Sequence, residues 1–178
     1  MKKILLLGLF VALISSCGKT NDKKEEYSDN IQDTFYGVKF GANEDEVLTA
    51  FTKEGLRLDK EAYEQGDLFF EGDSVGGVSF VDFDWDYVAV RHKYNRFNFI
   101  GFIKRNDTKD IALEKYIIIL STLSKKYHMK PIDLGDAIIS FYCDSKNGNK
   151  QVCLFLDKDE RDVYFINLMY SNIEKYEY

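Results

Sequence analysis

The stretch Gly72–Gly76 reads G-D-S-V-G, a G-x-S-x-G pattern in which the serine can act as the nucleophile of a hydrolytic enzyme. That chemistry needs a strand before the serine and a helix directly after the turn. A strand is predicted before Ser74, over Leu68–Glu71, but a glycine pair and an alternating strand pattern follow it. The two histidines, His92 and His128, are predicted in a strand and at a helix end. We therefore predict that Ser74 lies in a turn, and that the chain has no catalytic residue and is not an enzyme.

Three aspartates, Asp82, Asp84 and Asp86, alternate along the next segment and match the start of a calcium-binding EF-hand loop. Such a loop also needs glycine at its sixth position and glutamate at its twelfth. Those positions here hold Tyr87 and Lys93. On one face of a strand, carboxylates two residues apart are separated by about 6.5–7 Å, too far to chelate one ion well without other ligands. We predict a solvent-facing acidic stripe, no metal site and no cofactor.

Two cysteines, Cys143 and Cys153, lie in strands predicted over Ala137–Asp144 and Lys150–Asp157. The Asn147-Gly148 pair between them is a strong hairpin signal. A two-residue loop would place the cysteines on opposite faces of the hairpin, whereas a three-residue loop would place them directly opposite each other. The second arrangement allows a disulfide, since a secreted protein meets an oxidising compartment, so Cys143–Cys153 is a candidate disulfide.

The N-terminus carries an export signal. Lys2 and Lys3 precede the apolar run Ile4–Ile14, which is shorter than the roughly 20 residues that span a bilayer and fits the hydrophobic region of a signal peptide. The run ends in Ile14-Ser15-Ser16-Cys17, which resembles the lipobox of bacterial lipoproteins. The resemblance implies cleavage before Cys17, a diacylglycerol on its sulfur and acylation of its new amino group. Residues 1–16 are then the signal peptide.

The segment after the lipobox indicates where the protein goes. Gly18 follows the cysteine, and by the sorting rules of bacterial lipoproteins this resemblance implies an outer-membrane anchor, facing the periplasm or the cell surface. Lys19–Asn30 is polar and lacks an apolar period, so residues 17–30 are predicted to be the lipidated cysteine and a flexible tether. The partners expected are the membrane, through the lipid on Cys17, and an envelope protein.

Composition limits the remaining classes. A net charge of −6 argues against a nucleic-acid-binding protein, which would show a basic face. The 12 Tyr and 14 Phe favour strands. We expect most of these aromatic side chains to fill a core between a sheet and its helices, and Tyr170, Tyr176 and Tyr178 to be the most exposed.

Two helices and several strands are predicted for the rest of the chain. The first helix covers Glu44–Glu54 and begins with the capping-box pattern Asn43-x-x-Glu46. The second covers Thr108–Tyr127 and is capped by Asp107. Its predicted apolar face consists of Leu113, Ile117, Leu120 and Leu123. The predicted strands are Leu56–Leu58, Leu68–Glu71, Val78–Trp85, Tyr87–Tyr94, Arg96–Ile103, Ala137–Asp144, Lys150–Asp157 and Asp162–Ser171.

Consecutive strands with short turns pair antiparallel, so the expected fold class is α+β, with the helices on one face of an antiparallel sheet. The element order indicates one domain over 31–178, built from two tandem repeats of a helix and three or four strands, at about 31–104 and 105–178. This order resembles the architecture of β-lactamase-inhibitor-like proteins and related small outer-membrane-assembly lipoproteins.

The resemblance implies a non-catalytic module that binds other proteins through its sheet face or loops. It includes no residue motif, so no functional residue can be carried over. The expected function is that of a lipid-anchored envelope protein that binds or assembles other proteins. The alternative is a cell-surface enzyme or a glycan-binding protein.

Overall fold

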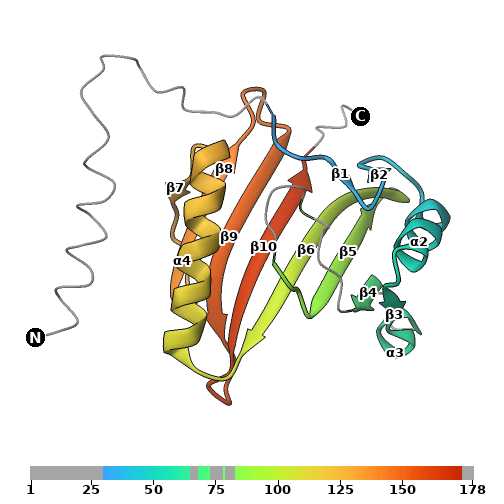
Figure 1. Cartoon of the computed structure of the whole chain (residues 1–178). Coiled ribbons are helices and arrows are strands. Elements are labelled where there is room, and N and C mark those ends of the chain that lie inside the picture. Colours follow the sequence, from blue (N-terminus) through green and yellow to red (C-terminus); the bar gives the residue numbers. More distant parts are fainter. Residues whose placement is uncertain (1–29, 65–67, 73–77, 79–82, 174–178) are drawn as a thin grey trace, which may run out of the picture.

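An eight-stranded sheet forms the centre of the fold (Figure 1). The computed structural model describes residues 30–64, 68–72, 78 and 83–173. Neighbouring strands pair antiparallel in the order β3-β4-β5-β6-β10-β9-β8-β7. The strands are β3 (Arg57–Leu58), β4 (Leu68–Glu71), β5 (Tyr87–Lys93), β6 (Arg96–Asn106), β7 (Lys130–Pro131), β8 (Ile139–Asp144), β9 (Lys150–Lys158) and β10 (Tyr164–Asn172). The predicted α+β class is confirmed.

The sheet is made of two units that meet at its middle. The chain passes through α2 (Glu44–Lys53) into β3 to β6, and then through α4 (Lys109–Lys126) into β7 to β10. The second unit has the reverse strand order of the first, so the last strands of the two units, β6 and β10, pair at the centre. A helix followed by four strands therefore describes both units. They differ in α3 (Lys60–Glu64), a short helix between β3 and β4 that was not predicted from the sequence.

Both long helices begin at capped residues. Asn43 Oδ1 accepts a hydrogen bond from Glu46 N at 3.0 Å, and the Glu46 carboxylate accepts one from Asn43 N at 2.8 Å, which confirms the predicted capping box. The prediction of Asp107 as the cap of α4 is wrong. Thr108 takes that place, and its hydroxyl accepts from Ile111 N at 3.4 Å. Its backbone is extended (φ −133°, ψ 148°), as an N-cap requires.

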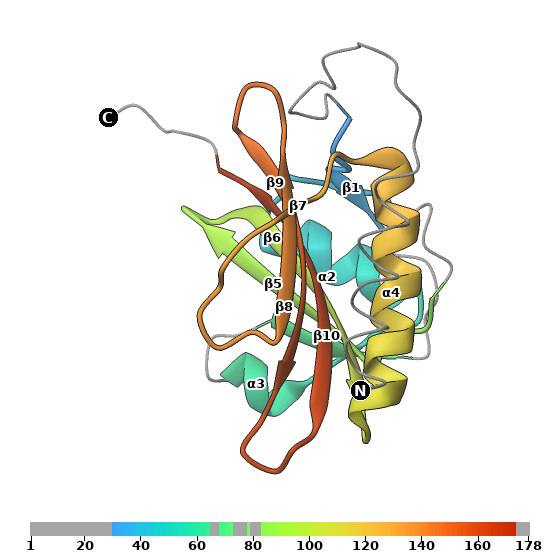
Figure 2. The ribbon, with the colours of Figure 1, turned by 90° about the vertical axis from the view of Figure 1, so that its left-hand side faces the viewer.

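The core lies between one face of the sheet and the long helices, and Figure 2 shows α4 along that side. Side chains alternate along each strand, so Phe102 of β6 and Leu168 of β10 are buried on this face. Phe51 of α2 reaches the same layer, and its ring centroid lies 5.0 Å from that of Phe70 in β4. Tyr170 was expected to be exposed, but it is fully buried because it lies on the same face of β10 as Leu168.

The buried side of α4 differs from the prediction. Leu120 and Leu123 are buried as expected, but Ile117 is only half-buried and Ile119 is buried in its place. The apolar run around these residues allows more than one face of the helix to pack, and the contact with the sheet decides which one does.

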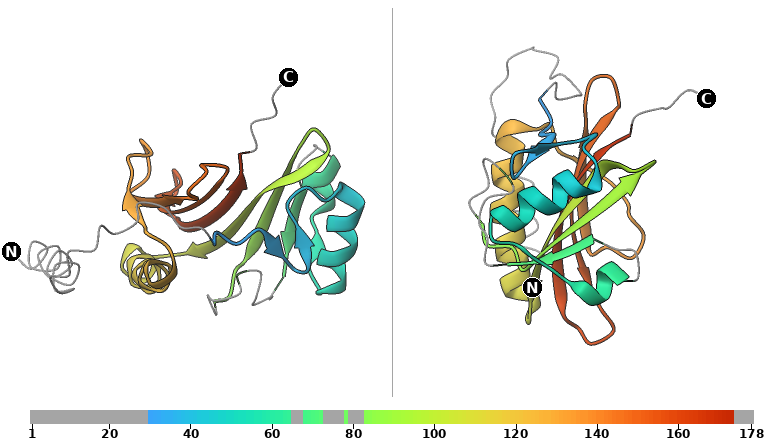
Figure 3. Two further views of the ribbon diagram at one scale, coloured as in Figure 1. Left: turned by 90° about the horizontal axis from the view of Figure 1, so that it is seen from above. Right: turned by 90° about the vertical axis from the view of Figure 1, so that its right-hand side faces the viewer.

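A short hairpin joins the N-terminal end of the described chain to the core. It consists of β1 (Thr34–Phe35) and β2 (Val38–Lys39), which lie on the same side of the sheet as α4 (Figure 3, left). Tyr36 and Gly37 form its turn, with φ angles of 50° and 80°. Two consecutive left-handed residues are what a two-residue type I′ turn needs. The side chain of Phe35 is buried in the core.

The strand predicted over Val78–Trp85 is not confirmed. Within the described residues 78 and 83–86, only an isolated bridge at Asp84 is present, and residues 79–82 lie outside the described part. Trp85 is buried with its ring centroid 5.7 Å from that of Phe102. Asp84 is exposed. The predicted alternation of core and solvent therefore holds for these two residues.

Candidate functional site

The serine motif and the lipobox lie outside the described residues, so the structure places neither Ser74 nor Cys17. His92 lies in β5, where it is half-buried and its ring centroid is 6.2 Å from that of Phe97. Burial lowers the pKa of His92, and the Glu44 carboxylate opposes this shift. His92 is therefore an uncharged packing residue at neutral pH.

One aspartate of the predicted acidic stripe forms hydrogen bonds within the chain. Asp86 accepts hydrogen bonds from Lys104 Nζ and from the backbone N of Arg105, both at 2.7 Å. We find no cluster of three or more potential metal-ligating side chains in the described part of the chain. Asp84 is exposed, and Asp82 lies outside the described residues.

The candidate disulfide is not formed in the structure, where no bond joins Cys143 and Cys153. Ser145 N donates to Lys150 O at 2.8 Å, which closes a loop over residues 146–149. This register pairs Cys143 with Val152. Cys143 consequently faces the core, and Cys153 points to the other side of the sheet.

Thiol reactivity tests this register. A Cys17→Ala variant should yield two free thiols after denaturation without reductant. In the folded protein, burial raises the pKa of the Cys153 thiol to about 11, so its labelling rate should rise about tenfold per pH unit from pH 8 to pH 10. A labelling rate that levels off by pH 9 would contradict this burial. The loss of both thiols would show that Cys143 and Cys153 are bonded.

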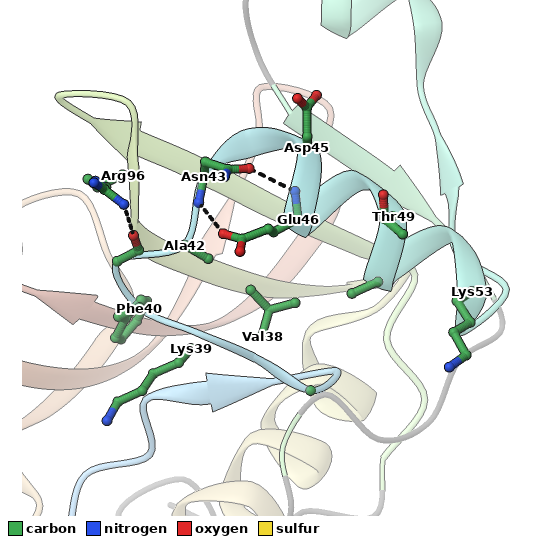
Figure 4. Close-up of a pocket in the computed structure, with 13 residues that line it drawn as sticks. Val38, Lys39, Phe40, Ala42, Asn43, Asp45, Glu46, Thr49, Lys53 and Arg96 are labelled. Atoms are coloured by element: carbon green, nitrogen blue, oxygen red, sulfur yellow. Dashed lines mark hydrogen bonds between the residues drawn. The ribbon is translucent and has the colours of Figure 1, made fainter.

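A groove lies beside α2, with a volume of about 860 Å³ (Figure 4). The polar groups at one end of it bond to one another. Asn43 and Glu46 form the capping box, and Arg96 donates to the carbonyl of Gly41 at 3.1 Å. These interactions hold the entry to α2 in place, which accounts for the polar lining at that end without a ligand.

The sheet face opposite α4 is the candidate functional site. We call it the open face; α3 flanks it at the β4 edge (Figure 2). Strand register arranges its side chains in rows across the sheet. One row runs Glu71, Tyr87, Ile103, Asn167, Phe155 and Ser140, and the next runs Phe69, Ala89, Gly101, Met169, Cys153 and Tyr142. Two shorter rows flank these, with Arg91, Phe99, Ser171, Gln151 and Asp144 on one side and Arg105, Phe165 and Asp157 on the other.

Apolar side chains surround Gly101 in the middle of the open face. At Gly101, a Cβ atom would lie 3.5 Å from the Phe99 ring and 3.7 Å from Met169 Cγ. The Phe99 ring therefore lies close over the glycine backbone. The Arg91 guanidinium lies over the same Phe99 ring, 5.2 Å from its centroid. This distance is typical of a cation–π contact.

A hollow of about 480 Å³ lies on the open face. Its floor includes Asn167, which is only 8% exposed and whose side-chain nitrogen donates to the carbonyl of Phe165 at 3.3 Å. The hollow is lined by Asp59, Phe69, Tyr87, Ile103, Phe155, Asp157, Phe165 and Asn167.

Sequence analysis assigned these aromatic residues to the core and did not identify the open face. A signal was present, because the segment Val152–Leu156 is apolar at every position. A strand with only one covered face would alternate apolar and polar residues. Without the register, however, such a run does not show which of its two faces the helices cover.

Comparison with known proteins gives no relative: no family model, no curated protein and no solved structure matches the chain. The described helices include none that is both long enough and apolar enough to cross a membrane.

Proposed function

We propose that the chain is a lipid-anchored protein of the bacterial envelope, without catalytic activity, whose open face binds a partner protein. The observation that supports this best is the apolar surface of the open face. The helices bury the other face of the sheet. On the open face, aromatic and aliphatic side chains stay only half-buried across the six neighbouring strands β4, β5, β6, β10, β9 and β8. A large apolar patch on one side of a small protein is typical of an interaction site.

The dimensions of the open face fit a protein better than a small molecule. Strands lie about 4.8 Å apart and each strand rises about 3.4 Å per residue. The rows therefore cover roughly 25 Å across the strands and roughly 20 Å along them, which approaches the scale of a standard protein interface. The charged residues at its margins, including Arg91, Arg105, Asp144 and Asp157, resemble the polar rim of such an interface.

Site-specific cross-linking tests this proposal. A photo-reactive amino acid at Met169, in the middle of the open face, should capture one protein reproducibly in native membranes. The same amino acid at Ile118, which is 56% exposed on α4, should not capture it. Adding Phe155→Ser to the Met169 protein should remove the captured product, because this change removes apolar contact area without touching the core.

The captured protein should then be identified, purified and measured directly. We expect Phe155→Ser to weaken its affinity by at least tenfold, as for a residue in the centre of an interface. Equal capture from Met169 and Ile118 would contradict the proposal. Capture of a polysaccharide in place of a protein would favour the glycan-binding alternative.

A further inference from the structure

We infer that the hollow on the open face is an anchor pocket for an arginine side chain that projects from the partner protein. This inference rests on the proposed function and specifies the chemistry of the partner. It follows from three properties of the hollow, which are its hydrogen-bond acceptors, its aromatic rings and its lack of any internal cation.

The hollow offers hydrogen-bond acceptors that the described residues do not use. Asp59 Oδ1 accepts from the backbone N atoms of Glu61 and Ala62 at 3.0 and 3.1 Å, and Asp157 Oδ1 accepts from Lys158 N at 2.7 Å. The second carboxylate oxygen of each aspartate has no hydrogen-bond partner among the described residues.

The floor of the hollow provides a third acceptor. Asn167 is more than nine-tenths buried, and its Oδ1 accepts no hydrogen bond from the described residues. This oxygen is not one of the buried atoms that lack a partner, so it is open to the hollow, where a ligand can supply a donor. The hollow thus favours a group rich in donors.

Aromatic rings surround these acceptors. Phe69, Tyr87, Phe155 and Phe165 all line the hollow. A guanidinium group has five N–H donors in one plane, stacks on aromatic rings and loses less hydration than an ammonium group. Arginine therefore matches both the rings and the acceptors, and it matches them better than lysine does.

Among the residues that the structure describes, no lysine or arginine lines the hollow. Two cations border the hollow without lining it. Arg57 lies two residues before Asp59, and Arg105 is the cross-strand neighbour of Phe165, with its guanidinium 3.9 Å from the carboxylate of Asp107. Lys158, next to Asp157 in the chain, has its Nζ 2.6 Å from Asp162. Neither Asp59 nor Asp157 forms an ion pair with a described residue, so both carboxylates can pair with a cationic ligand.

Short peptides test the inference on the full-length chain in non-ionic detergent micelles. The probes are acetyl-Leu-Arg-Leu-amide and the same peptide with uncharged citrulline in place of arginine, followed by two-dimensional ¹H–¹⁵N NMR. The arginine peptide should shift the side-chain amide signals of Asn167 in a saturable manner. The citrulline peptide should bind at least tenfold more weakly.

Matched variants separate pocket contacts from general charge. Asp157→Asn should weaken the binding of the arginine peptide at least fivefold. Asp59→Asn should weaken it to the same extent, and the asparagine side chain can still cap α3. Asp144→Asn is the control, because it makes the same charge change on the open face outside the hollow, and it should alter the affinity by less than twofold.

Two results would overturn the inference: equal binding of the arginine and citrulline peptides, or an equal loss with Asp144→Asn and Asp157→Asn. Either result leaves the cross-linking experiment unaffected, since capture at Met169 does not depend on arginine. Failure of the anchor pocket and failure of the proposed function are therefore distinguishable.

Discussion

We expect the Cys17→Ala variant to lose fatty-acid labelling completely and to move from the membrane fraction to the soluble fraction or remain uncleaved. Only the Cys17 sulfur follows the lipobox pattern. Each buried CH₂ group of an acyl chain contributes about 0.8 kcal/mol to membrane binding, and two or more chains anchor a protein stably. Metabolic labelling with palmitate, followed by membrane fractionation, measures both effects.

Cys153→Ser is the matched control for this experiment, because it removes a thiol that lies half-buried in the folded domain. Its labelling should equal that of the unmodified sequence. Undiminished labelling of Cys17→Ala would show that the Ile14–Cys17 pattern does not direct lipidation, and the proposed membrane anchor would then be wrong.

Among the variants proposed here, Phe51→Ala should lower the free energy of unfolding the most. The Phe51 side chain is completely buried, and its ring centroid lies 4.7 Å from that of Tyr36 and 5.0 Å from that of Phe70. Removal of a buried phenylalanine side chain costs about 3–5 kcal/mol, which for a domain of this size lowers the melting temperature by about 6–20 °C. Thermal and denaturant unfolding followed by circular dichroism would measure it.

Phe155→Ala provides the comparison, because it makes the same chemical change on the open face. We expect it to cost clearly less than Phe51→Ala, since Phe155 keeps contact with solvent and leaves no enclosed cavity. Equal losses for the two variants would mean that the open face is covered in the folded protein. That outcome would remove the main support for partner binding.

Much of the fold followed from local patterns. The Asn43-x-x-Glu46 box marked the start of α2 because capping depends on a few adjacent residues. Strands β4, β5 and β9 agree with their predicted ranges to within one residue. Helix α3 and strand β7 were not predicted, since elements so short depend on their neighbours for stability.

The candidate site could not be predicted in the same way. The hollow joins Asp59, Tyr87 and Asp157, which are far apart in the sequence and come together only through strand pairing. Strand register also determined which faces of the sheet the two cysteines occupy, because a shift of one residue in the hairpin moves a side chain to the other face.

The sequence by itself predicts an export signal with a lipidated Cys17, and it indicated the α+β class and the order of the longer helices and strands. These depend on short segments whose pattern is readable locally. The tertiary structure alone decided that β6 and β10 pair at the centre, that Cys143 and Cys153 point to opposite faces, and that an apolar face stays open. The physical reason is that side chains in strands alternate between two faces, and only the pairing of distant segments and the packing of the helices determine which face becomes the core.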